Sequence, residues 1–258
     1  MLLAQAPDFI CLQEFDPLYR TPSDGSDSLI KLISGKYTEV AIDGVEKNTV
    51  YNPVFFDHTR YTLVTSGYVE KYASNSVEYS YPGYPTGYTG VKEDGNTYGR
   101  SLVWAVLKDA WGDLFLIANV HFSQVDAGQN GDLTERAAIQ SAEAVFVANK
   151  VKEIANGYEG ITVLVGGDMN SNATTNAGCG VDTMLSNGFT HTYNLASDKN
   201  NVESYHGGKA PTTGYLEYAI DHILTLNEAL NVRSFYVLND EALYDVSDHL
   251  PVRMTFCK

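Results

Sequence analysis

The polar residues that could do chemistry stand at the ends of apolar, strand-like runs. The run VLVGGD ends at Asp168, and Asn170 follows two residues later. Alone, this is also ordinary turn chemistry, because glycine tolerates positive φ and Asp and Asn bond their own backbone. Other apolar runs place polar groups at or near their ends in the same way: Gln13 and Glu14, Asn119 and His121, Asp221 and His222, Asp248 and His249. Because neighbouring strand ends lie close in packed sheets, we expect these groups to converge on one site.

The residue types at these strand ends fit a narrow range of chemistry. Carboxylate and carboxamide oxygens bind hard cations such as Mg²⁺ or Mn²⁺, and histidines can neutralise, orient or protonate an oxyanion. The sequence contains no GxSxG nucleophile elbow, no GxxxxGK[ST] loop and no HExxH helix. Metal-assisted attack of water on a phosphoryl group is the reaction class that uses all of these groups.

Five short motifs carry a resemblance to a known family. They are LQE (12–14), NVH (119–121), GDMN (167–170), IDHI (220–223) and SDH (247–249). Each is weak alone, but in this order they resemble the motifs of the endonuclease/exonuclease/phosphatase superfamily, the fold of pancreatic deoxyribonuclease. The resemblance covers nearly the whole chain and implies an α/β (α+β) fold, a four-layered sandwich of two mixed β-sheets flanked by helices.

The resemblance assigns metal and water chemistry to the carboxylates. It implies that Glu14 is a ligand of Mg²⁺ or Mn²⁺ and that Asp248 approaches the metal from the last turn. It further implies that Asp168 orients or deprotonates the attacking water, while Asn170 holds that water or the phosphate. The alternative for Glu14 is a carboxylate that only ends a strand.

The resemblance also assigns roles to the two histidines of the site. His249 would contact the phosphoryl oxygens and carry positive charge toward the transition state, with Asp221 accepting its other N–H. His121 would contact the phosphate or protonate the leaving group, and its alternative is a core histidine. His222 stands where the family often has tyrosine, so we expect it to be structural.

Two further residues are candidates for substrate binding. Arg100 matches an arginine that some family members place near the site, and guanidinium suits phosphate oxygens; a surface salt bridge is the alternative. His206 lies in a segment that also holds Tyr205 and Lys209, just before the site aspartate, where family members place a substrate loop.

The net charge of the chain indicates which class of phosphate ester it would bind. The chain has 258 residues and a formal net charge of −15, whereas proteins that grip duplex nucleic acid usually present a basic face. We therefore expect a phosphate mono- or diester of a small molecule or lipid headgroup. A nuclease is the alternative, since a local basic patch or bridging metal ions would suffice, and a non-catalytic binding domain is another.

Hydrophobic periodicity predicts the elements that position these residues, in one domain over 1–258. Strands are predicted at 8–14, 49–57, 61–69, 100–109, 113–122, 161–168, 218–226, 230–238 and 250–257. Helices are predicted at 26–34 and 133–155, the latter with Ala138, Val145 and Ile154 in its apolar stripe. The Tyr-, Gly- and Pro-rich segment 68–98 predicts no regular structure; a packed surface loop and a substrate-selecting rim are equally compatible with it.

The start of the chain departs from the family pattern. Family members begin with a strand that ends in an asparagine, and only 13 residues precede Glu14 here, of which MLLAQAP resembles the tail of the following helix. We therefore expect an N-terminally short form with weakened or absent catalysis, explained by a truncated chain, by a misassigned start, or by another segment that completes the sheet. No membrane-spanning run or targeting segment is visible, so a soluble protein is expected, either cytoplasmic or secreted with its signal absent from this chain; the oligomeric state is open.

Overall fold

A computed structural model describes two compact units of the chain. The described residues are 2–15, 20, 28–46, 50–70, 101–124, 133–172 and 179–258. The first unit comprises residues 1–79, 87–121 and 154–163, and the second comprises 80–86, 122–153 and 164–258. The single domain over 1–258 stays a prediction. Within the described ranges, no helix has both the length and the apolar character needed to cross a membrane.

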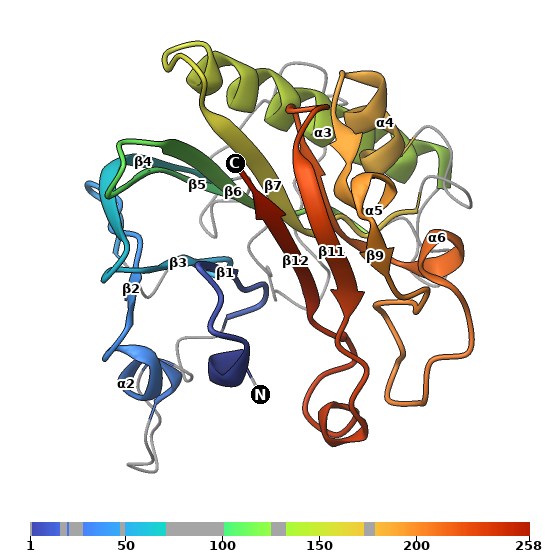
Figure 1. The fold of residues 1–258 in the computed structure, drawn as a ribbon. Coiled ribbons are helices and arrows are strands. Elements are labelled where there is room, and N and C mark those ends of the chain that lie inside the picture. The colour runs from blue at the N-terminus through green and yellow to red at the C-terminus, as the bar shows by residue number, and fades with distance from the viewer. Residues whose placement is uncertain are drawn as a thin grey trace. The chain divides into compact units, whose positions relative to one another are not determined.

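The first unit is built mainly of antiparallel strands. One group has the order β1-β3-β2 and the other has the order β4-β5-β6. The strands are β1 (Phe9–Cys11), β2 (Tyr37–Glu39), β3 (Val54–Asp57), β4 (Tyr61–Glu70), β5 (Ser101–Asp109) and β6 (Leu114–His121). Two short helices, η1 (Leu2–Gln5) and α2 (Leu29–Ile33), precede β1 and β2 respectively (Figure 1).

Aromatic packing joins the two strand groups of the first unit. The ring of Phe9, on β1, lies 4.7 Å from that of Tyr61 on β4 and 5.8 Å from that of Phe115 on β6, measured between centroids. Tilted and edge-on rings at such distances stabilise a core beyond the apolar area that they bury. These ring contacts pack β1 against β4 and against the start of β6 at Phe115.

The second unit combines strands and helices. Its strands are β7 (Thr162–Asp168, within this unit from Leu164), β8 (Thr190–His191), β9 (Asp198–Lys199), β10 (Asp221–Thr225), β11 (Asn231–Val237) and β12 (Val252–Cys257). Its helices are α3 (Leu133–Ala155, within this unit to Glu153), α4 (Gly180–Ser186), α5 (Thr192–Leu195), α6 (Tyr215–Tyr218) and η3 (Glu241–Leu243). β10 pairs antiparallel with β7 and β8, whereas β11 pairs antiparallel with β12 and parallel with β9. The expected α/β sandwich of mixed sheets and helices is confirmed (Figure 1).

The core of the second unit is aromatic. The rings of Tyr193 and Tyr215 stack at 4.7 Å, and Phe235 of β11 meets both edge-on. Tyr215 and Phe235 are fully buried. The strand predicted at 218–226 begins later, because Tyr218 is the last residue of helix α6, whose first residue Tyr215 packs in this core, and β10 begins only at Asp221.

Helix α3 has the predicted bounds, but its predicted apolar stripe is wrong at Val145. That side chain is 39% exposed, whereas Ala144, Val147, Ala148 and Val151 are buried. These four residues follow the i, i+3, i+4, i+7 spacing of one helix face, so the buried face is rotated by one position. Ile154 is half-buried, and the side chain of Ala138 lies outside the described part of the helix.

Two other predicted boundaries shift. Strand β3 begins at Val54 rather than near residue 49, because Pro53 has no N–H to donate to a strand partner. The segment predicted to lack regular structure from residue 68 begins later, since β4 continues to Glu70 against β5; its residues 71–98 lie outside the described part of the chain.

Candidate active site

Two carboxylates face each other where β7 ends and β10 begins. The antiparallel register places Asp221 directly opposite Asp168, and His222 opposite Gly167. Gly167 has φ 143°, which favours glycine because it has no Cβ. The double glycine therefore carries the strand to its end in a conformation that an ordinary side chain would resist.

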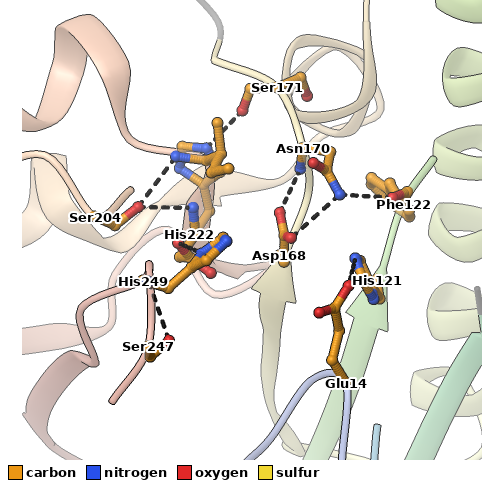
Figure 2. Close-up of polar contacts among 12 residues, drawn as sticks. Glu14, His121, Phe122, Asp168, Asn170, Ser171, Ser204, His222, Ser247 and His249 are labelled. Atoms are coloured by element: carbon orange, nitrogen blue, oxygen red, sulfur yellow. Dashed lines mark hydrogen bonds and ion pairs between the residues drawn. The ribbon is translucent and has the colours of Figure 1, made fainter. Parts of the chain in front are cut away.

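The Asp168 carboxylate is held by Asn170, which lies two residues later in the turn. Its Oδ1 accepts the Asn170 backbone N–H at 2.8 Å, and its Oδ2 accepts the Asn170 side-chain amide at 3.2 Å (Figure 2). The same amide donates to the carbonyl of Phe122 at 2.9 Å. Asn170 has φ 47°, the left-handed region that asparagine enters more readily than most residues. The asparagine thus fixes the orientation of the buried carboxylate.

Asp221 and His249 form an ion pair in the same unit. His249 Nδ1 donates to Asp221 Oδ2 at 2.8 Å. The Ser204 hydroxyl accepts the backbone N–H groups of Ile220 and Asp221 at 3.1 Å each (Figure 2). His249 is also flanked by Tyr205, whose ring lies 5.1 Å away. The imidazole is therefore fixed on two sides, with one ring nitrogen committed to Asp221.

Charge favours the protonated form of this histidine. Burial alone would lower the pKa of His249, but attraction to Asp221, and further to Asp168 and Asp248, raises it to about 10. Burial would likewise raise the pKa of Asp221, yet the neighbouring His249 charge holds it below its ordinary value. At neutral pH the pair is consequently an imidazolium and a carboxylate.

Asp168, Asp221 and His249 also form a group that could hold a cation. One ligand atom of each lies within 4.8 Å of the others. Since a protonated imidazole has no lone pair to offer, His249 in this form is a hydrogen-bond donor, and only the two carboxylates offer oxygen atoms to a cation. Asp248, the predicted ligand beside His249, has an exposed side chain, and its carbonyl accepts the His206 and Gly207 N–H groups at 2.9 and 3.3 Å.

In the first unit, Glu14 and His121 lie together. The His121 Nε2 and a Glu14 carboxylate oxygen are 4.0 Å apart (Figure 2), with the His121 side chain buried and that of Glu14 52% exposed. Asn119 positions this pair: its amide donates to the Leu12 carbonyl at 2.8 Å, and its oxygen accepts from Gln13 at 2.6 Å. The chain just before Glu14 is therefore tied to β6, which ends at His121.

Glu14 has φ 52°, a conformation that is unfavourable for a glutamate. Strain of this kind gathers at functional sites. We therefore expect Glu14→Gly to raise the free energy of unfolding by about 1 kcal/mol, because glycine adopts this conformation freely, while Glu14→Gln leaves stability unchanged. Urea denaturation of the three proteins measures this, and equal midpoints for the glycine and glutamine variants would show that no strain is stored there.

Comparison with solved structures decides the fold. A mannosyl-6-phosphatase of Bacteroides thetaiotaomicron matches with a TM-score of 0.70 at 18% identity, over 100% of this chain and 88% of that one. An endonuclease/exonuclease/phosphatase family protein of the same organism matches with a TM-score of 0.69 at 17% identity, over 98% and 84%. The chain has the fold of the endonuclease/exonuclease/phosphatase superfamily.

The fold also occurs in a protein of a different kind. TDP2 of D. rerio, solved in complex with a single-strand DNA product, matches with a TM-score of 0.63 at 15% identity, over 100% of this chain and 88% of that one. No family model and no curated protein matches the chain. The superfamily fold is therefore visible through structure, at identities too low to carry a substrate across.

Three other residues named from the sequence remain to be placed: Arg100, His206 and His222. Arg100 lies outside the described residues. His206 is buried, with its Nδ1 accepting the Gly208 N–H at 3.1 Å and its ring 4.9 Å from that of Tyr244, so its role in substrate binding stays a prediction. His222, expected to be structural, is buried and bonded to His191 and to the Ser171 carbonyl.

Two residues that bond the backbone near the site, Ser204 and Gln140, belong to none of the five motifs. Ser204 holds the start of β10, and Gln140, fully buried on α3, bonds the turn that contains Asn170. Only the observed buried face of α3 marks Gln140 as a buried polar residue, because the predicted residue Val145 lies on another side of the helix. Nothing in the sequence around Ser204 distinguishes it from other loop serines.

Proposed function

We propose that this chain is a divalent-metal-dependent phosphoesterase that hydrolyses a phosphate mono- or diester by attack of water. The observation that carries the proposal is the cluster of Asp168, Asp221 and His249, in which an imidazolium is held beside two facing carboxylates. An imidazolium and an oriented carboxylate in one small cluster suit this reaction. It needs a base that directs water and a positive charge beside the phosphoryl oxygens.

Each side chain of the cluster has a task in this proposal. Asp168, oriented by Asn170, directs or deprotonates the attacking water. His249 donates from its imidazolium to the phosphoryl oxygens, and Asp221 keeps that ring charged and oriented. His121 contacts the phosphate or protonates the leaving group. Arg100 and His206 are proposed to bind substrate.

The donor set fits Mg²⁺ or Mn²⁺, because carboxylate oxygens are the ligands that these hard cations prefer. Glu14 and Asp248, whose side chains are both exposed, are the ligands that we propose. When bound, the ion polarises a phosphoryl oxygen and makes water more acidic. The strained backbone of Glu14 supports a functional rather than a packing role for that residue.

Charge favours a small-molecule or lipid-headgroup substrate over nucleic acid. The net charge of −15 opposes sequence-independent binding to a polyanion, and one protein of the same fold is a mannosyl-6-phosphatase. The specific alternative is a nuclease, since another protein of this fold is solved with a DNA product. A binding domain without catalysis is the remaining alternative.

Hydrolysis assays test the proposal directly. The substrates are bis-p-nitrophenyl phosphate, p-nitrophenyl phosphate, mannose 6-phosphate and supercoiled plasmid DNA, whose nicking is followed. Each is assayed with Mg²⁺, Mn²⁺ or EDTA, and Asp168→Asn protein is the blank. We expect metal-dependent turnover of a small ester that is absent from the blank. Turnover of plasmid alone would establish the nuclease, and turnover that survives both EDTA and the blank would contradict the proposal.

A further inference from the structure

Three successive carbonyls just after Asp168 accept hydrogen bonds from buried side chains. The carbonyls belong to Met169, Asn170 and Ser171, and the donors come from α3 and β10. Most loop carbonyls at a protein surface bond water instead. A turn whose backbone is bonded from inside the protein has little freedom to change its conformation.

Gln140 supplies two of these three bonds. Its Nε2 lies 2.9 Å from the Met169 carbonyl and 3.1 Å from the Asn170 carbonyl, and it also contacts the Ser123 carbonyl at 2.6 Å. The Gln140 oxygen accepts the Gly180 N–H at 2.6 Å. With both ends of the amide engaged and the residue fully buried, Gln140 ties the turn to α3 and to the start of α4.

His222 supplies the third bond through a chain of hydrogen bonds whose direction is fixed. His191 Nδ1 accepts the Tyr193 N–H at 3.2 Å, so a neutral His191 carries its hydrogen on Nε2. That hydrogen is donated to His222 Nδ1 at 2.8 Å. His222 must then carry its own hydrogen on Nε2, and donates it to the Ser171 carbonyl at 2.8 Å (Figure 2).

The bonded turn contains the left-handed Asn170, whose N–H and side-chain amide orient the Asp168 carboxylate. We propose that Gln140 and His222 are positioning residues, which hold Asn170 in this conformation and so aim Asp168 at the attacking water. The inference deepens the proposed function and rests on it. Neither residue touches the carboxylate; both act on it through the backbone of residues 169–171.

Two substitutions test the inference without introducing a buried charge. Gln140→Met keeps the length of the side chain and removes its donors, and His222→Leu removes the donor to Ser171. For each we expect kcat to fall by about tenfold to a hundredfold, the range found for residues that orient active groups, with KM within about twofold because the substrate contacts remain. His222→Gln, which can again donate to the Ser171 carbonyl, should recover most of the loss.

A matched control separates positioning from stability. Thr192 is fully buried, and its hydroxyl donates to the Ile223 carbonyl of β10 at 2.7 Å without touching the turn. Thr192→Val therefore removes a comparable buried bond, and it should leave kcat unchanged even if it lowers the midpoint of urea denaturation. Equal loss of kcat in this variant would overturn the positioning role.

A second measurement does not depend on activity. The Asn170 amide hydrogen should exchange with solvent faster in Gln140→Met and His222→Leu than in wild-type or Thr192→Val protein, when followed by NMR in EDTA. Unchanged exchange together with unchanged kcat would overturn the inference. If Asp168→Asn fails to abolish hydrolysis, the proposed function falls, while the exchange rates still report whether the turn is held by Gln140 and His222.

Discussion

Asp168→Asn is expected to lower kcat for hydrolysis of the phosphate ester by about a thousand-fold, within the range lost when a general base is removed. The carboxamide has nearly the shape of the carboxylate, but it cannot accept a proton from water. Its oxygen can still accept the Asn170 N–H that Asp168 accepts at 2.8 Å. KM should change little, because the loss falls on the transition state rather than on substrate binding.

Stability should respond only weakly to this substitution. The bond from the Asn170 side chain at 3.2 Å would be weakened, at a cost of about 1 kcal/mol, while the repulsion between the facing Asp168 and Asp221 carboxylates is relieved. Urea denaturation beside the kinetic assay measures both effects. Asp198→Asn, at an exposed aspartate on β9, is the control, and a binding domain without catalysis would show no difference between the two variants.

The second large effect concerns the charge of His249. In metal-free protein its pKa, followed by NMR of the ring protons, should lie near 10. Asp221→Asn should lower that pKa by about 1–3 units, the usual effect of one opposite charge at this distance, because burial then acts against fewer carboxylates. Asp248→Asn should lower it less, since Asp248 contributes less than Asp221. A pKa near 6.5 in the wild-type protein would contradict the ion pair.

The same pair makes stability depend on pH. The raised His249 pKa stabilises the fold fully below the unfolded value of 6.5, and this contribution disappears as the pH rises from 6.5 through about 10. The lowered Asp221 pKa stabilises the fold above the unfolded value of 3.8, and this is lost as the pH falls below it. The contribution of the pair is therefore largest between pH 3.8 and 6.5. Urea midpoints measured on both sides of this range, below pH 3.8 and from pH 6.5 to about 10, should fall in both directions for the wild-type protein and give a flatter profile for Asp221→Asn.

The elements of the fold, and the types of residue at their ends, could be predicted from local sequence patterns. Apolar runs with turn residues between them predicted the strands that end at His121 and Asp168, and α3 matches its predicted bounds. The order of five short motifs predicted the superfamily fold, which the structural comparisons confirm. These features were readable because strand propensity, helix periodicity and turn chemistry are local properties of the chain.

The contacts that hold the site could not be predicted in this way, because they form between distant parts of the folded chain. Helix α6 delays the start of the strand predicted at 218–226, because the Tyr215 ring packs in a core assembled from distant segments. The bond from Gln140 to the Asn170 carbonyl and the bond between His191 and His222 join residues far apart in the sequence. Local preference cannot specify such bonds, since each depends on which donor faces which carbonyl once the core has formed.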